Sequence, residues 1–154
     1  MFMHFYELMK EKYKDKEVLL FVDMDGVIAS YDFGRPLDFK NKRPMKANIE
    51  TLRKVSELEN VTLNILSICR KDYQIQEKNE WLDLYAPFFK KENRNVISKE
   101  SVTGFSSAEL KLNFLENLDT DKLIIMLDDD NKVLEVLSRS KRDIILYQDS
   151  ELVD

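Results

Sequence analysis

Residues 18–30 constrain the fold more than any other stretch, because an apolar run leads directly into two closely spaced acids. Five apolar residues (18–22) are followed by Asp-Met-Asp-Gly, which places carboxylates at Asp23 and Asp25. Five residues suit a buried strand and are too few for a typical helix. Side chains alternate along a strand, so the two acids share one side, while Gly26 lets the backbone turn at once. The pattern predicts a buried strand that ends in a charged site.

The two acids need a partner of opposite charge. Two carboxylates in one small volume repel each other unless a cation or a shared proton lies between them. A hard divalent cation bound by oxygen is the simplest partner. Binding sites in open α/β sheets gather at the carboxyl ends of the strands, where this pair is expected. The alternative interpretation is an Asp-Gly turn that only ends the strand.

The composition is that of a globular domain. The chain has 154 residues, of which 44% are hydrophobic and 34% charged, with three Gly and three Pro. A chain of this length buries a core without staples, so we expect a single domain over 1–154. No apolar run approaches the length of a membrane span, and no basic segment precedes an apolar run at the amino terminus. We therefore expect a soluble, cytoplasmic protein without membrane contact; the sequence leaves its oligomeric state open.

Single cysteine and histidine residues narrow the possible chemistry. Cys69 has no second cysteine to pair with, and His4 is the only histidine, which argues against a disulfide and a Cys/His zinc site. His4 lies in an amphipathic helical pattern, so a catalytic triad built on it is improbable. The net charge of −5 argues against nucleic-acid binding over a broad basic surface. Carboxylates are left as the expected catalytic groups.

Helical and strand patterns alternate along the chain. Apolar residues recur at helical spacing over 2–13, 45–59, 72–89, about 107–118 and 131–138. Apolar, strand-like runs occupy 18–23, 61–67, 95–98, 123–127 and 143–147. This alternation predicts a three-layer α/β fold with a mainly parallel, five-stranded sheet. The stretch 31–44, which contains Gly, Pro and several cations, is predicted to be a loop or short hairpin near the acids.

Two further strands are expected to deliver polar groups to the same edge of the sheet. The run 123–127 leads into Asp128, Asp129 and Asp130, whose mutual repulsion indicates a nearby cation. We assign Asp130 to the cap of the following helix. The run 61–67 ends in Ser67, which is either a ligand contact or an ordinary turn residue.

Taken together, these motifs resemble those of the haloacid dehalogenase-like (HAD) phosphatase superfamily, over almost the whole chain. The Asp-Met-Asp-Gly sequence after the first strand is similar to the first motif of that family. Ser67 stands where the second motif has Ser or Thr, and Asp128-Asp129 is similar to the acidic pair of the fourth. The third motif is a lysine; Lys111 is our choice and Lys99 the rival.

The resemblance implies a Rossmann-like fold and a magnesium-dependent phosphatase mechanism. Asp23 would attack a phosphate monoester to form an aspartyl-phosphate, and Asp25 would act as general acid and base. Ser67 and Lys111 would hold the phosphate. Independently of the resemblance, Arg35, Arg43, Arg70 and Lys71 are candidate substrate contacts that no motif supports, and Arg70 is our choice among them. The implied protein ligands of Mg²⁺ are Asp23, the backbone carbonyl of Asp25, Asp128 and Asp129.

The lengths of the links between the motifs constrain the class of substrate. The link from Gly26 to the second strand and the link from Ser67 to Lys111 are each too short for a large cap domain. An open site admits a phosphorylated small molecule, or a large substrate such as a nucleic-acid end or a phosphoprotein. Residues 78–82 are loosely similar to the deoxyribonucleotidase branch of the superfamily. There are two alternatives to hydrolysis. The chain could transfer the phosphoryl group to another acceptor, or it could have a non-catalytic binding or scaffold role on the same fold.

Overall fold

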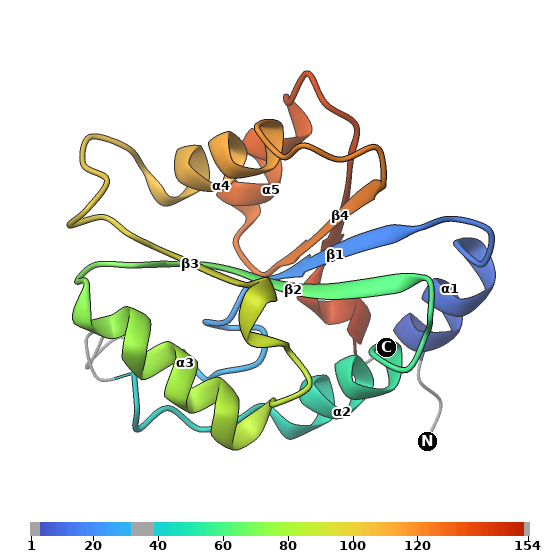
Figure 1. The fold of residues 1–154 in the computed structure, drawn as a ribbon, viewed down its shortest axis with the longest axis horizontal. Helices are drawn as coiled ribbons and strands as arrows, with labels where there is room; N and C mark the ends of the chain where they lie inside the picture. Colours follow the sequence, from blue (N-terminus) through green and yellow to red (C-terminus); the bar gives the residue numbers. More distant parts are fainter. Residues whose placement is uncertain (1–3, 32–38, 153–154) are drawn as a thin grey trace.

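A computed structural model describes residues 4–31 and 39–152, and their fold is a five-stranded parallel sheet between two layers of helices (Figure 1). The strands are β1 (Val18–Val22), β2 (Val61–Cys69), β3 (Arg94–Ser98), β4 (Leu123–Asp128) and β5 (Ile144–Gln148). The α-helices are α1 (His4–Lys12), α2 (Lys46–Val55), α3 (Tyr73–Tyr85), α4 (Ser107–Glu116) and α5 (Asn131–Ser138). Short 3-10 helices, η1 (Lys91–Asn93) and η2 (Asp149–Leu152), complete the described elements. The predicted three-layer, Rossmann-like α/β fold is confirmed.

Each face of the sheet carries its own hydrophobic core, because strand side chains alternate between the faces. In β1, Leu20 and Val22 pack into the larger core, beneath α1, α2 and α3. Phe21 points to the opposite face and packs with residues of α4 and α5, including Leu115 and Val133. Figure 1 shows the same division, with α1 to α3 on one side of the sheet and α4 and α5 on the other.

The sheet order places β1 at the centre. The order is β3-β2-β1-β4-β5, so the chain moves outward from β1 to β3 and then crosses back to place β4 on the other side of β1. Such a reversal opens a crevice at the carboxyl ends of the two strands that flank it. The register sets Val22 opposite Leu127, and the Asp23 backbone N–H donates to the Leu127 carbonyl at 3.1 Å. Asp23 and Asp128 therefore leave the sheet side by side.

Helix ends follow the expected capping chemistry. Ser106 caps α4, because its hydroxyl accepts the Glu109 backbone N–H at 3.1 Å, and the Glu109 carboxylate accepts the Ser106 backbone N–H in return. The Asp130 carboxylate accepts the backbone N–H of Lys132 at 2.9 Å, which confirms its predicted role as the cap of α5.

Two boundaries differ from the sequence prediction. β2 continues two residues past Ser67 to Cys69, because Ile68 and Cys69 pair with β3, so Ser67 lies inside the strand. The helix predicted over 72–89 ends earlier, at Tyr85, and Ala86 takes a non-helical conformation just before Pro87.

The described parts of the links between the site-bearing strands contain only single elements of the sheet and its helix layers. The described part of the link from β1 to β2 contains α2, and the link from β2 to β4 contains α3, η1, β3 and α4. Residues 32–38 of the predicted 31–44 loop lie outside the described residues, whereas 39–44 form an irregular segment with one bridge from Pro44 to Ala29.

None of the helices in 4–31 and 39–152 is long and apolar enough to cross a membrane.

Candidate active site

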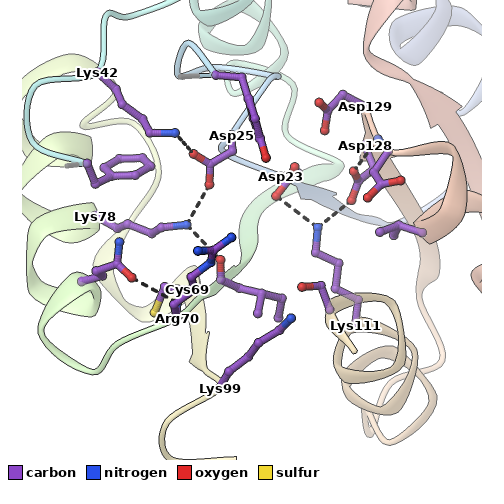
Figure 2. A pocket seen from close by; sticks show the side chains of 17 residues that line it. Asp23, Asp25, Lys42, Cys69, Arg70, Lys78, Lys99, Lys111, Asp128 and Asp129 are labelled. Carbon is purple, nitrogen blue, oxygen red and sulfur yellow. Dashed lines mark hydrogen bonds and ion pairs between the residues drawn. The ribbon is translucent and has the colours of Figure 1, made fainter. Parts of the chain in front are cut away.

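A cavity of about 540 Å³ opens at the carboxyl ends of β1, β2 and β4 (Figure 2). The expected site residues Asp23, Asp25, Arg70, Lys111, Asp128 and Asp129 all line it. So do two lysines for which the sequence analysis assigned no role, Lys42 and Lys78. Seven of the charged side chains form two groups with opposite net charge: Asp23, Asp128, Asp129 and Lys111 in one, and Asp25, Lys42 and Lys78 in the other.

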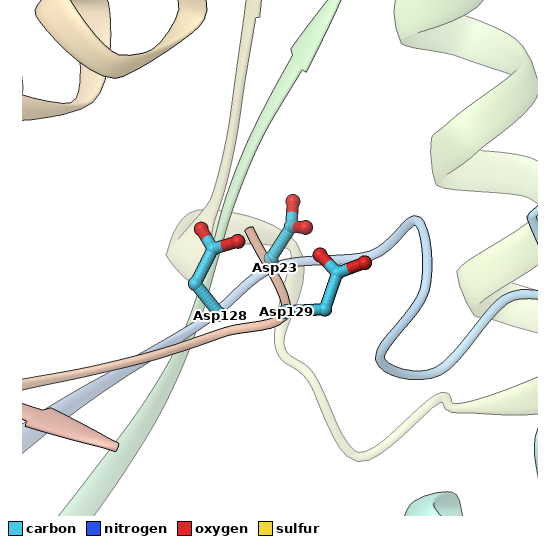
Figure 3. Close-up of side chains that lie close together, drawn as sticks. All are labelled: Asp23, Asp128 and Asp129. Carbon is cyan, nitrogen blue, oxygen red and sulfur yellow. The ribbon is translucent and has the colours of Figure 1, made fainter. Parts of the chain in front are cut away.

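The first group is an acidic cluster formed by Asp23, Asp128 and Asp129 (Figure 3). One carboxylate oxygen from each residue lies within 4.8 Å of the others. Asp23 and Asp128 are buried at the ends of adjacent strands, and Asp129 is partly exposed. Burial raises the pKa of Asp23 well above its usual range, Lys111 opposes the rise and Asp128 adds to it. Burial and the charge of Asp128 raise the pKa of Asp129 to about 6.

Lys111 is the lysine of the acidic cluster. Its ammonium group lies 3.1 Å from a carboxylate oxygen of Asp23 and 2.6 Å from one of Asp128. Burial lowers the lysine pKa, but the two carboxylates outweigh this effect and raise it above its usual value. Lys99, the rival candidate, lines the same cavity but forms no ion pair with any residue in the described ranges.

A glycine lets Asp129 approach the end of β1. Gly26 has a φ of +81°, a conformation that L side chains rarely adopt. A Cβ atom added at Gly26 would lie 2.0 Å from Oδ2 of Asp129, which is too close for any real contact. The turn after Asp25 therefore requires glycine both for its backbone and for the position of Asp129.

The second group is a lysine clamp, in which Lys42 and Lys78 hold Asp25. The Lys78 ammonium lies 3.1 Å from Oδ2 of Asp25, and the Lys42 ammonium contacts Oδ1 (Figure 2). Both lysines are almost fully buried, with exposed fractions of 1% and 7% for Lys78 and Lys42. Burial raises the Asp25 pKa, but the two ammonium groups outweigh it, so the pKa lies below its usual value. The clamp holds Asp25 as a carboxylate.

Helix α3 brings Lys78 to the clamp. Its buried residues, Gln74, Lys78, Trp81 and Leu82, follow the i, i+4, i+7, i+8 spacing of one helix face. Lysine on an apolar helix stripe is unusual unless its charge is paired, and that was the signal available in the sequence. No such signal marks Lys42, whose segment is irregular. Its carbonyl accepts the indole N–H of Trp81 at 2.9 Å, which ties this segment to α3.

Ser67 lies behind Lys78. Its hydroxyl oxygen is 2.6 Å from the Lys78 ammonium, which also donates to the Ile68 carbonyl at 3.2 Å. Ser67 is fully buried and is not among the residues that line the cavity. Its expected contact with phosphate stays a prediction; in this structure Ser67 accepts the hydrogen bond that orients the clamp.

The acidic cluster has a donor set that could bind a metal ion. All three groups are carboxylates, and hard cations such as Mg²⁺ prefer oxygen ligands. One ammonium group balances only part of the charge of three carboxylates, and the negative charge of Asp128 adds to burial in raising the pKa values of Asp23 and Asp129. The residues therefore fit the expected Mg²⁺. The Asp25 side chain lies outside the cluster, and the role of its backbone carbonyl stays a prediction.

Comparison with known proteins supports the fold. No family model matches the sequence, and no curated protein matches it. Two solved structures are similar, described as "Structure of the Pnkp1/Rnl/Hen1 RNA repair complex" and "Structure of Pnkp1/Rnl/Hen1 complex". Their TM-scores are 0.64 and 0.66, each at 14% identity, over 86% and 87% of this chain. The chain spans less than half of the chains that it matches, 43% and 46%. At this identity the likeness establishes a shared fold.

Proposed function

We propose that this chain, acting as one domain, is a magnesium-dependent phosphatase that hydrolyses phosphate monoesters through an aspartyl-phosphate on Asp23. The observation that carries the proposal is the convergence of Asp23, Asp128, Asp129 and Lys111 at the ends of β1 and β4. The resemblance to HAD-like phosphatases assigns these residue types to this chemistry. The RNA-repair complexes named among similar structures favour a nucleotide or a phosphorylated nucleic-acid end as substrate.

The first step forms a bond between a carboxylate oxygen of Asp23 and phosphorus, while the ester P–O bond breaks. Mg²⁺, held by Asp23, Asp128 and Asp129, would offset the repulsion between the attacking carboxylate and the phosphate. Lys111 contacts Asp23 and can donate to a phosphate oxygen from the same position. The buried carboxylate is thereby kept in place for attack.

The leaving oxygen takes a proton from Asp25. In the free protein the lysine clamp favours the unprotonated carboxylate, so the proton must be gained with the substrate. A bound phosphate competes with Asp25 for Lys42 and Lys78, and each contact it takes from Asp25 makes protonation easier. In the second step Asp25 accepts a proton from water, whose oxygen attacks phosphorus. The bond between Asp23 and phosphorus then breaks, which releases phosphate and restores the Asp23 carboxylate. Asp25 holds the proton taken from water and loses it to solvent when Lys42 and Lys78 close on it again.

The test is phosphate release from nucleotides, sugar phosphates and phosphorylated oligonucleotides, with Mg²⁺ and with chelator. Asp23→Asn keeps the shape of the side chain but removes the nucleophile, so turnover should be lost while the protein stays folded. Asp130→Asn is the matched control, because Asn caps a helix as well as Asp and this residue lies outside the acidic cluster. A fully active Asp23→Asn variant would refute the proposal.

A further inference from the structure

Two cations line the cavity apart from the clamp and the acidic cluster. Arg70 follows β2 and Lys99 follows β3, at the carboxyl ends of neighbouring strands. The backbone N–H of Lys99 donates to the Cys69 carbonyl at 2.9 Å, and that of Arg70 donates to Oε1 of Gln74 at 3.1 Å. The first bond holds the two backbone segments side by side, and the second ties Arg70 to the start of α3. In the view of Figure 2 the Arg70 side chain ends between Lys78 and Lys111, and the Lys99 side chain extends from below toward Lys111.

Glu100, the acid next to Lys99 in the chain, is already paired with another cation. Its carboxylate lies 3.2 Å from the ammonium of Lys71, the neighbour of Arg70. Within 4–31 and 39–152, neither Arg70 nor Lys99 forms an ion pair. Two positive charges thus line the cavity with no carboxylate partner among the described residues, in a chain whose net charge is −5.

Arg70 and Lys99 lie on the side of the cavity toward which the leaving group would depart. Asp23 is buried on the cavity floor, whereas Arg70 is exposed and Lys99 is partly exposed at the mouth. In an in-line displacement the leaving group departs on the side of phosphorus opposite to the nucleophile. A leaving group that departs from Asp23 toward solvent therefore passes the Arg70 and Lys99 side chains.

Phosphate is the anion that this pair suits. A guanidinium group binds phosphate oxygens through two parallel N–H donors, and an ammonium group adds a compact charge. An uncharged alcohol or sugar would leave both cations unused. The aromatic ring of Tyr31, 56% exposed, also lines the cavity and offers a face on which a nucleobase can stack.

We propose that Arg70 and Lys99 form a second anion subsite, which binds the phosphodiester next to the terminal phosphate of a nucleic-acid strand. The site then acts on a phosphorylated strand end in preference to a free nucleoside monophosphate. This inference rests on the proposed phosphatase function and names its substrate class. It also explains how an acidic protein binds a nucleic-acid end without a broad basic surface.

The test compares kcat/KM for phosphate release from hexanucleotides phosphorylated at the 3′ or the 5′ end with that from the matching nucleoside monophosphates. The wild-type chain should prefer one of the hexanucleotides by about tenfold or more, as expected for a phosphate contact of this kind. Arg70→Gln combined with Lys99→Gln should reduce that preference to near unity, mainly through KM. Raising the salt from about 50 to about 200 mM should weaken it in the wild type.

Lys71→Gln is the matched control, because it removes a neighbouring cation that pairs with Glu100 and does not line the cavity. It should keep the preference. Equal kcat/KM for strand ends and monophosphates in the wild type, or a preference that survives in the double variant, would overturn the subsite.

A binding measurement separates this inference from the proposed function. Fluorescence anisotropy of a labelled, phosphorylated hexanucleotide is measured with Asp23→Asn, alone and combined with the Arg70 and Lys99 substitutions. Tighter binding to the single variant supports the subsite whether or not the wild type releases phosphate. Equal binding refutes it. Absence of phosphate release from every substrate would instead refute the phosphatase proposal.

Discussion

The acidic cluster and the lysine clamp use the same two residue types in opposite proportions. The cluster has three carboxylates and one ammonium group, that of Lys111, which pairs with Asp23 and Asp128, whereas in the clamp two ammonium groups share the carboxylate of Asp25. Asp23 and Asp25 are two residues apart, yet the pKa of the first is raised by burial and the pKa of the second is lowered against burial by its lysines. Partners from distant segments, rather than the motif itself, decide what each acid can do.

The two groups, with their opposite net charges, suit two different ligands. The acidic cluster has negative charge to spare and suits a cation, and the clamp has positive charge to spare and suits an anion. A phosphate ester bound with Mg²⁺ satisfies both requirements at once. The four predictions that follow change one side or the other.

Loss of Lys111 should have the largest effect. Lys111→Met leaves Asp23 and Asp128 buried without their shared cation, and breaking a buried pair in this way costs about 3–5 kcal/mol of unfolding free energy. Turnover should fall by about 10²–10³-fold, because a preorganised charge at the phosphate is lost. Urea unfolding in the presence of chelator measures the loss of stability, and an assay of phosphate release measures the loss of turnover. Adding Asp128→Asn should recover part of the stability; a single variant as stable as the wild type would contradict the buried pairing.

Magnesium should stabilise the acidic cluster next most strongly. At a concentration 100 times its Kd, a ligand that binds only the folded state adds about 2.7 kcal/mol. Thermal unfolding with Mg²⁺ and with chelator measures this gain. Asp129→Asn removes one carboxylate of the cluster and should reduce the gain, whereas Asp130→Asn should keep it. An equal gain in both variants would place the cation elsewhere.

Loss of Lys78 tests the clamp. Lys78→Met removes donors from Asp25, from the buried Ser67 hydroxyl and from the Ile68 carbonyl. Unsatisfied buried acceptors of this kind cost about 1–3 kcal/mol in unfolding free energy. Lys42→Met is the comparison, because Lys42 contacts only Asp25 among these groups and its carbonyl bond to Trp81 is retained. Urea unfolding should rank Lys78→Met as the more damaging; the reverse order would show that Lys78 does not organise the clamp.

Gly26→Ala should have the smallest effect on stability but a selective effect on the cluster. A positive φ costs alanine about 1–2 kcal/mol, and the added Cβ also displaces the Asp129 carboxylate. Mg²⁺ affinity, measured by calorimetry, should fall by about tenfold, as when a metal ligand loses its support. Gly104→Ala is the control, since Gly104 has a φ of +88° but open space around the new Cβ. Equal loss of Mg²⁺ affinity in both variants would contradict the role given to Gly26.

Sequence periodicity predicted the sheet well because strand patterns and their order follow from burial. The runs at 18–23 and 123–127 were recognisable as buried strands, and the parallel register then brought Asp23 beside Asp128. Of the two lysines considered for the third motif, Lys111 contacts these acids, because it lies on α4, the helix that immediately precedes β4; its catalytic role stays a prediction.

The lysine clamp could not be predicted in the same way. Long, flexible side chains reach their partners across the fold, and Lys42 and Asp25 meet only after an irregular segment closes over α3. Ser67 was predicted at a strand end, but pairing with β3 extends β2 past it and leaves the serine beneath Lys78. Both outcomes depend on tertiary pairing rather than on local pattern.

The bond from Trp81 to the Lys42 carbonyl supplies an optical reporter. Trp81 is the only tryptophan of the chain, and its buried indole also lies edge-on to Phe39 at 5.8 Å between ring centroids. Indole emission responds to the polarity around the ring and to its hydrogen bond. The residue whose backbone carbonyl accepts this indole N–H is also the one whose ammonium an anion would draw from Asp25, so tryptophan emission offers a label-free signal in which to look for the arrival of an anion at the clamp.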